Sequence, residues 1–128
     1  MGKSNLTKVK EITIETKQKV YDRQHGRSIT GAFCPIEYGS FHHFIGRGVG
    51  GHGYEWNIVM LTFDEHRSYH DKKPIKVNGR DRYTIEEFET LMRNHLVMNY
   101  ANWSVENCKV HKYFEEADYG VIRRNALV

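Results

Sequence analysis

The sequence predicts an α+β domain in which a pair of short strands lies between helices. Two T-x-x-E motifs, Thr62 to Glu65 and Thr84 to Glu87, each precede a run of helix formers, as capping boxes do at helix starts. Upstream of the first motif, two short apolar and aromatic runs flank a glycine-rich segment, which is typical of two strands joined by a loop. No repeat, low-complexity segment or linker divides the chain, so one domain over 1–128 is expected.

The first half of the chain contains a helix and the strand pair. Residues 13–25 are mostly helix formers, and Gly26 follows them where a helix C-cap glycine lies. Glycines and a proline in 27–40 predict turns between short extended pieces. The next expected elements are a strand over 41–45, a glycine-rich loop over 46–53 and a strand over 55–61.

The second half is expected to be mainly helical. The first capping box opens a helix over 63–72, which Pro74 ends because proline disfavours helical geometry just before it. A turn at Asn78-Gly79 precedes the second capping box. That box opens a helix over 85–100 with apolar residues at i, i+3 and i+4. The segment 104–116 is expected to form a short helix, followed by a loose tail.

Composition sets limits on the environment of the protein. The chain is 39% apolar and 27% charged with a formal net charge of +3, which fits a soluble globular protein and alone says little about a nucleic-acid partner. The longest central apolar run, Ile58 to Leu61, is far too short to span a membrane. No signal peptide is expected, and the isolated Cys34 and Cys108 suggest free thiols in the reducing cytoplasm.

Histidines supply the candidate chemistry. His66 and His70 lie four residues apart on an expected helix, a separation of about 400° and about 6 Å, so both side chains share one face. His42 and His43 lie on an expected strand, where neighbouring side chains point to opposite faces. One of the two can complete a three-imidazole metal site with open positions. The other keeps a free ring nitrogen, which suits a general base at neutral pH.

Asn57 stands at the far end of the glycine loop, at the start of the second expected strand. Its amide can bind backbone groups across the loop and fix the strand pair, or its oxygen can coordinate a metal ion. The order of these residues is His42-His43, Asn57 fourteen positions after His43, His66 nine positions further and His70 four positions later. With its strand–loop–strand–helix context and the upstream VYDRQHG, this constellation resembles the HNH nuclease motif.

The resemblance covers residues 13–72, with the motif core at 27–72, and it implies the ββα-metal fold. This fold is a two-stranded antiparallel hairpin plus a helix, here flanked by an N-terminal helix and a helical C-terminal extension over 84–128. The resemblance further implies that His43 is the general base and that Asn57 holds the loop bearing it, or touches the metal. The implied metal ligands are His42, His66 and His70.

The chain departs from many family members in one respect. Those members carry two CxxC pairs that bind a structural zinc, whereas this chain has only Cys34 at the first pair. The positions of the second pair hold Thr62 and Glu65, the ends of the capping box. No structural zinc is therefore expected. The cap fixes the helix start instead, and the C-terminal helix is expected to supply extra core.

The reaction that the resemblance implies is hydrolysis of DNA phosphodiester bonds, with double-stranded DNA as the substrate. Arg47 is a candidate phosphate clamp in the glycine loop. Gly48, Gly50 and Gly51 would allow close approach of a nucleic-acid backbone, although a mobile turn is an equally simple interpretation of them. Three imidazoles favour Zn²⁺, Ni²⁺, Co²⁺ or Mn²⁺, while Mg²⁺ would need oxygen from a neighbour such as Asp64, Glu65 or Asp71.

Similar small proteins are common in bacteriophages, which suggests packaging or recombination proteins as partners and the host cytoplasm as the location. No membrane partner is expected. One alternative is a non-catalytic DNA-binding module in which Cys34, His43, His66 and His70 close a four-ligand zinc site with no open position. Another is a degenerate nuclease that acts as an interaction protein.

Overall fold

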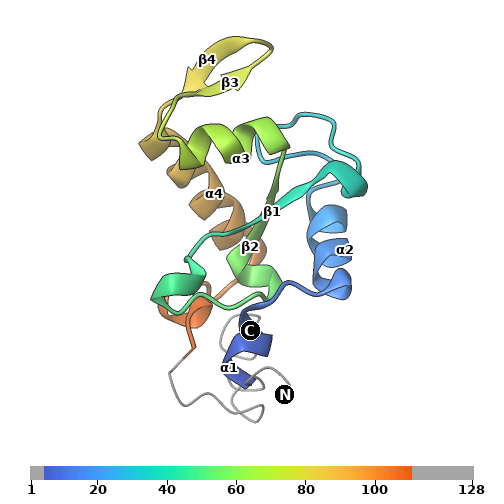
Figure 1. The fold of residues 1–128 in the computed structure, drawn as a ribbon, viewed down its shortest axis with the longest axis vertical. Coiled ribbons are helices and arrows are strands. Elements are labelled where there is room, and N and C mark those ends of the chain that lie inside the picture. The colour runs from blue at the N-terminus through green and yellow to red at the C-terminus, as the bar shows by residue number, and fades with distance from the viewer. Residues whose placement is uncertain (1–4, 111–128) are drawn as a thin grey trace.

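The computed structural model describes residues 5–110, and it is an α+β fold as the sequence predicts (Figure 1). Short 3₁₀ turns at Ile36–Tyr38, Arg47–Val49, Glu55–Asn57 and Glu106–Cys108 connect some of the helices and strands. The helices and strands are, in order, α1 (Asn5–Lys10), α2 (Ile14–Arg23), β1 (Ser40–His43), β2 (Ile58–Leu61), α3 (Phe63–His70), β3 (Ile75–Val77), β4 (Arg80–Tyr83) and α4 (Ile85–Asn99).

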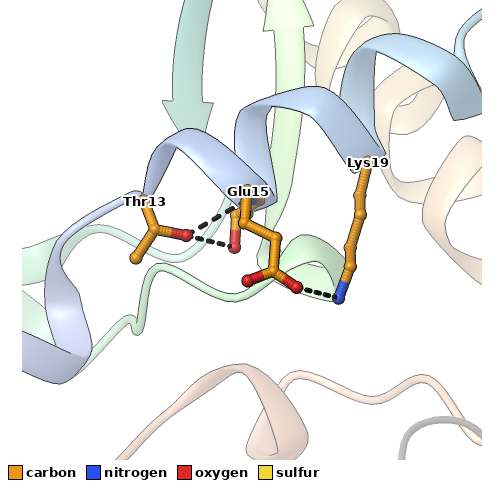
Figure 2. A network of polar contacts seen from close by, with 4 residues as sticks. Thr13, Glu15 and Lys19 are labelled. Atoms are coloured by element: carbon orange, nitrogen blue, oxygen red, sulfur yellow. Dashed lines mark hydrogen bonds and ion pairs between the residues drawn. The ribbon is translucent and has the colours of Figure 1, made fainter.

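Helix α2 matches the helix expected over 13–25. Its N-cap is Thr13, whose hydroxyl accepts a hydrogen bond from the Thr16 amide at 3.1 Å. Figure 2 shows this cap together with an ion pair between two residues that are one helical turn apart. In this pair the Lys19 ammonium lies 3.4 Å from the Glu15 carboxylate. The helix ends at Arg23, and Gly26, three residues later, adopts φ +69° and donates its amide to the carbonyl of Tyr21. Such a left-handed residue is the reason that glycine is favoured there. Helix α1 is an addition that the sequence pattern did not indicate.

Strands β1 and β2 form the expected antiparallel pair, with Ser40 opposite Leu61 and His43 opposite Ile58. The second strand is shorter than expected, because Glu55–Asn57 forms a 3₁₀ turn in which the Asn57 amide donates to the Tyr54 carbonyl. The prediction of a strand from residue 55 was therefore wrong for these three residues.

The capping box at the start of α3 is confirmed. The Thr62 hydroxyl accepts from the Glu65 amide at 3.1 Å, and the Glu65 carboxylate accepts from the Thr62 amide at 2.9 Å. The helix ends at His70, slightly earlier than the expected 72, because Lys72 adopts a φ of +56° just before Pro74. This cap fixes where α3 begins, and so fixes the direction of the side chains one and two turns later.

The core lies on both faces of β2, all four residues of which are buried. Val59 and Leu61 pack with the α4 residues Phe88, Met92 and Leu96. The alternate β2 residues, Ile58 and Met60, pack with Val20 of α2. Helix α4 thus supplies core to one face of the strand pair, as expected for the helix over 85–100, and α2 covers the other.

The expected turn at Asn78-Gly79 belongs to a second antiparallel hairpin, β3–β4, that the sequence pattern did not indicate. It stands beyond α3, at the end of the long axis opposite α1 (Figure 1).

The segment expected to form a helix over 104–116 is described only to residue 110, where it contains a single 3₁₀ turn, Glu106–Cys108. The remainder of this helix and of the extension to 128 lies outside the described residues. The Asn107 carbonyl accepts from the Trp56 indole at 2.6 Å, and the Trp103 indole donates to the Trp56 carbonyl at 2.7 Å, so the chain after α4 is held against the 3₁₀ turn that precedes β2. Among the described helices, none is long and apolar enough to cross a membrane.

Candidate metal centre

The candidate centre begins with His42, the third residue of β1. Strand alternation turns its ring toward α3, where the side chain is 7% exposed. Its Nε2 is buried and has no hydrogen-bond partner among the described residues. A buried polar atom without a partner is costly, and native structures rarely leave one. This nitrogen therefore has the properties of a ligand that faces its metal ion.

His66 and His70 complete the cluster from α3. Their rings lie 5.2 and 5.8 Å from the His42 ring, measured between centroids, and their two Nε2 atoms are 2.8 Å apart. The ligand atoms of all three histidines lie within 4.8 Å of one another. The structure thus brings together the three residues that the sequence predicted as ligands. The donor set fits one ion with protein ligands on one side and open positions on the other.

Two residues that support the cluster were missed in the sequence. The Ser40 hydroxyl hydrogen-bonds Nδ1 of His66, which leaves Nε2 of His66 facing the cluster. Tyr69 packs edge-on against His42 at 5.2 Å, and its hydroxyl donates to the Glu89 carboxylate at 2.8 Å. A signal for Ser40 did exist, since it lies two residues before His42 on the same face of the strand. Contacts of this kind orient metal-binding imidazoles and fix their tautomers.

Burial favours the neutral form of two of the three imidazoles, His42 and His66. Desolvation is the largest cause that lowers the pKa of His42, to about 3, and the nearby His66 and His70 lower it further. Burial and then His70 also lower the pKa of His66. Because a metal ion binds the unprotonated nitrogen, these pKa shifts leave His42 and His66 ready to bind an ion at neutral pH.

His43 points away from the cluster, as strand alternation predicts. Its Nε2 lies 2.8 Å from the Lys10 carbonyl, and since a carbonyl only accepts, the neutral ring donates there and keeps its lone pair on Nδ1. Burial is the main cause that lowers the pKa of His43; the Lys10 carbonyl opposes this shift and the Arg47 charge adds to it. The ring is therefore a neutral base at physiological pH.

Asn57 is fully buried and holds the loop that follows β1. Its Oδ1 accepts from the Ile45 amide at 2.8 Å, and its Nδ2 donates to the Ile45 and His52 carbonyls at 3.0 and 2.8 Å. Both ends of the amide are thus engaged with backbone. Of the two roles left open by the sequence, the structure supports the one in which Asn57 fixes the loop.

The glycine loop is packed in part and open in part. The Gly50 and Gly51 amides donate to the Arg47 and Gly46 carbonyls, so these two amides are used within the loop. Gly48 has no atom within 4 Å of the place where a Cβ would stand. The Arg47 side chain is exposed.

A hollow of about 470 Å³ lies beside His43. Lys17 of α2 enters it with its ammonium 5.6 Å from the centre of the Phe41 ring. The sequence did not mark Lys17, because its approach to β1 depends on the packing of α2. The hollow is lined by Glu11, Ile12, Lys17, Gly39, Ser40, Phe41, His43 and Arg47.

The four-ligand zinc alternative is not assembled in the structure. Cys34 is buried, with its sulfur 3.9 Å from the Leu61 carbonyl, and His43 faces away from α3. Within residues 5–110, the only group of His, Cys, Asp or Glu side chains close enough to hold one ion is the three-histidine cluster. Neither Cys34 nor any carboxylate belongs to it.

Comparison with known proteins identifies no relative: no family model, curated protein or solved structure matches this chain.

Proposed function

We propose that this protein is a metal-dependent endonuclease of the HNH type that hydrolyses phosphodiester bonds in DNA. One observation carries the proposal: a single short strand presents His42 to a three-imidazole cluster on one face and His43, a neutral base, on the other. Hydrolysis of a phosphodiester requires both functions, since the phosphate charge must be neutralised and the attacking water must lose a proton.

The charge of the ligand set favours an anionic substrate. His42, His66 and His70 are neutral ligands, so a divalent ion that they hold keeps its full charge, and its open positions attract anions. When bound, such an ion supplies Lewis-acid chemistry, withdrawing charge from the scissile phosphate. Imidazole ligands without a carboxylate suit Zn²⁺, Ni²⁺, Co²⁺ or Mn²⁺ better than Mg²⁺. Glu65, one expected oxygen donor, is instead occupied with Ser28 and Thr30.

His43 would act as the general base. The Lys10 carbonyl holds the ring by Nε2, so Nδ1 is the atom that accepts the proton from water. Such a base contributes about 10² to 10⁴ in rate. Asn57 supports it indirectly by fixing the backbone of Ile45, two residues beyond the base.

Cations near His43 would position the phosphate backbone. Lys17 and Arg47 both line the hollow beside the base. Arg47 is exposed, and its guanidinium can bind a phosphate through two parallel hydrogen bonds. Lys17 rests above Phe41, which limits the positions of its charge and reduces the entropy lost on binding.

Cleavage of supercoiled plasmid tests the proposal. The wild-type protein is incubated with Zn²⁺, Ni²⁺, Co²⁺, Mn²⁺ or Mg²⁺ and with a chelator, beside His43→Ala and His66→Ala. We expect His43→Ala to lose about 10²-fold or more in rate while it retains metal binding by calorimetry. We expect His66→Ala to lose both cleavage activity and metal binding. His25→Asn is the matched control, because His25 is exposed, far from the cluster in sequence and in a left-handed conformation that asparagine tolerates.

Cleavage by His43→Ala at the wild-type rate would exclude His43 as the general base. Metal binding without cleavage under any condition would instead leave an interaction module with an intact metal site.

A further inference from the structure

The basic excess of this chain is concentrated in one protruding element. Residues 72–83, here called the basic hairpin, comprise β3, β4 and the two lysines before Pro74. They hold five of the nineteen lysines and arginines but one of the sixteen acids, so their net charge is +4. The rest of the chain has fourteen cations and fifteen acids, a net charge of −1. The cations are Lys72, Lys73, Lys76, Arg80 and Arg82.

The hairpin is anchored at its base and free at its tip. Ile75 is fully buried in the core and pairs with the half-buried Tyr83, whereas the residues from Asn78 to Arg82 are all exposed. The turn has φ values of +52° at Asn78 and +78° at Gly79, the signature of a tight type I′ turn. Figure 1 shows the ribbon reaching away from the body beyond α3. A tip with so little apolar contact adds little to the core.

Most of these charges have no ion-pair partner among residues 5–110. Within the described part of the chain, no ion pair involves a cation of the basic hairpin. Asp81 stands opposite Lys76 in the strand register, and Arg82 lies 4.5 Å above the Tyr83 ring and faces Glu87. If Asp81 balances the charge of Lys76 and Arg82 is not counted, three exposed positive charges are still unbalanced. They are Lys72, Lys73 and Arg80.

We propose that the basic hairpin is an arm that binds the backbone and groove of duplex DNA. A two-stranded ribbon fits the major groove, which is about 12 Å wide. The lysines and arginines at its edges would meet phosphates, of which duplex DNA presents one per about 1.7 Å of axis. The exposed tip contains no aromatic side chain on which an unpaired base could stack, so its chemistry fits a duplex better than a single strand.

The arm continues directly from the candidate metal centre. Helix α3 ends at His70, and β3 begins at Ile75. A duplex bound by the hairpin would therefore lie beside the helix that carries His66 and His70. The choice of DNA as partner rests on the proposed function, but binding by the arm requires neither the metal ion nor His43.

Fluorescence anisotropy with a labelled duplex of about two helical turns, in chelator and over a range of salt concentrations, tests the arm. The variant Lys72→Gln, Lys73→Gln, Arg80→Gln, which removes the three uncompensated charges, is compared with the control Lys8→Gln, Lys19→Gln, Lys109→Gln, which loses the same charge elsewhere. We expect the hairpin variant to bind about tenfold or more weakly and its log–log salt slope to be shallower by about 2 to 3, because each phosphate contact contributes about 0.9. The duplex affinity and the salt slope of the control should stay near those of the wild type. Circular dichroism should show that all three proteins are folded.

Equal losses in the two variants, an unchanged salt slope in the hairpin variant, or no duplex binding by the wild type would overturn the inference. So would displacement of the duplex by polyglutamate as effectively as by unlabelled duplex, since the arm would then fit an acidic protein. Hairpin-dependent binding without plasmid cleavage would defeat the nuclease proposal and leave the arm intact. Plasmid cleavage with the same KM for the wild type and the hairpin variant would support the nuclease proposal and count against the arm.

Discussion

Replacing Gly51 by alanine should destabilise the protein strongly, because the loop after β1 leaves no room for a side chain there. A Cβ on Gly51 would lie 1.7 Å from the Ile45 oxygen and 2.5 Å from the Ile45 carbonyl carbon. Ordinary contact begins near 3.4 Å, so one of the two backbones would have to move by about 1.7 Å. Ile45 is held on both its amide and its carbonyl by Asn57, and Gly51 itself donates to the Gly46 carbonyl at 2.9 Å.

The cost follows from these contacts. Forced overpacking costs about 1 to 3 kcal/mol, and each hydrogen bond lost in the shift adds about 1 kcal/mol. We therefore expect Gly51→Ala to lower the free energy of unfolding by about 3 kcal/mol and the melting temperature by about 10 °C.

Urea and thermal unfolding, followed by circular dichroism, measure the effect. Gly48→Ala is the matched control in the same loop, since Gly48 has open space around it and lies in the 3₁₀ turn without a left-handed φ. Alanine there should be neutral or stabilise by about 0.5 kcal/mol, because it restricts the unfolded chain. If both variants unfolded within about 0.5 kcal/mol of the wild type, the loop would be the mobile turn that its composition also allows, and the rigid loop described here would be refuted.

Two further predictions concern the metal centre and pH. Ser40→Ala removes the hydrogen bond to Nδ1 of His66, so we expect metal affinity by calorimetry to fall about 10- to 100-fold; an unchanged affinity would show that the hydroxyl does not orient the ring. For His52, burial is the main cause that lowers the pKa to about 4, while the Asn107 carbonyl opposes the shift, and Nδ1 already accepts from the Tyr54 amide. The unfolded chain therefore binds the extra proton between about pH 6.5 and 4, and His52 alone should lower stability by up to roughly 3 kcal/mol as the pH drops through that window, in addition to the loss from His42. Urea unfolding at several pH values checks this, with a shallower pH dependence expected for His52→Gln.

The parts of this fold that sequence predicted well are those set by neighbours along the chain. Both capping boxes form where T-x-x-E occurs, because a cap involves only four consecutive residues. The separation of His42 from His43 follows from strand alternation, and the pairing of His66 with His70 follows from helical periodicity. The three-histidine cluster was therefore predictable as soon as the strand and the helix were placed.

Other features depend on segments that meet only in the folded protein. The Lys10 carbonyl reaches His43 from 33 residues away, and no local pattern encodes this contact. The 3₁₀ turn at Glu55–Asn57 replaces the first three residues of the expected strand, and in it the Asn57 amide group contacts Ile45 across the loop. In the β3–β4 hairpin the apolar alternation covers only the three residues of β3, and β4 is mostly charged, which is too little to mark two strands. The clearer signal is the Asn78-Gly79 pair, which is typical of a two-residue hairpin turn.

The start of α3, the helix that carries His66 and His70, is held by Glu65. This side chain connects the segment that follows α2 to the first turn of the helix. Its Oε1 caps α3 through the Thr62 amide, while its Oε2 accepts from the hydroxyls of Ser28 and Thr30.

The carboxylate is 5% exposed and therefore acts as a buried polar link between the segment that follows α2 and the first turn of α3. Hydrogen bonds to a buried carboxylate are charge-assisted and are each worth about 1.5 to 3 kcal/mol. His66 follows Glu65 directly, so the link that fixes the helix start also fixes the first helical ligand. The capping box in this chain thus serves both helix initiation and the placement of His66 in the candidate metal centre.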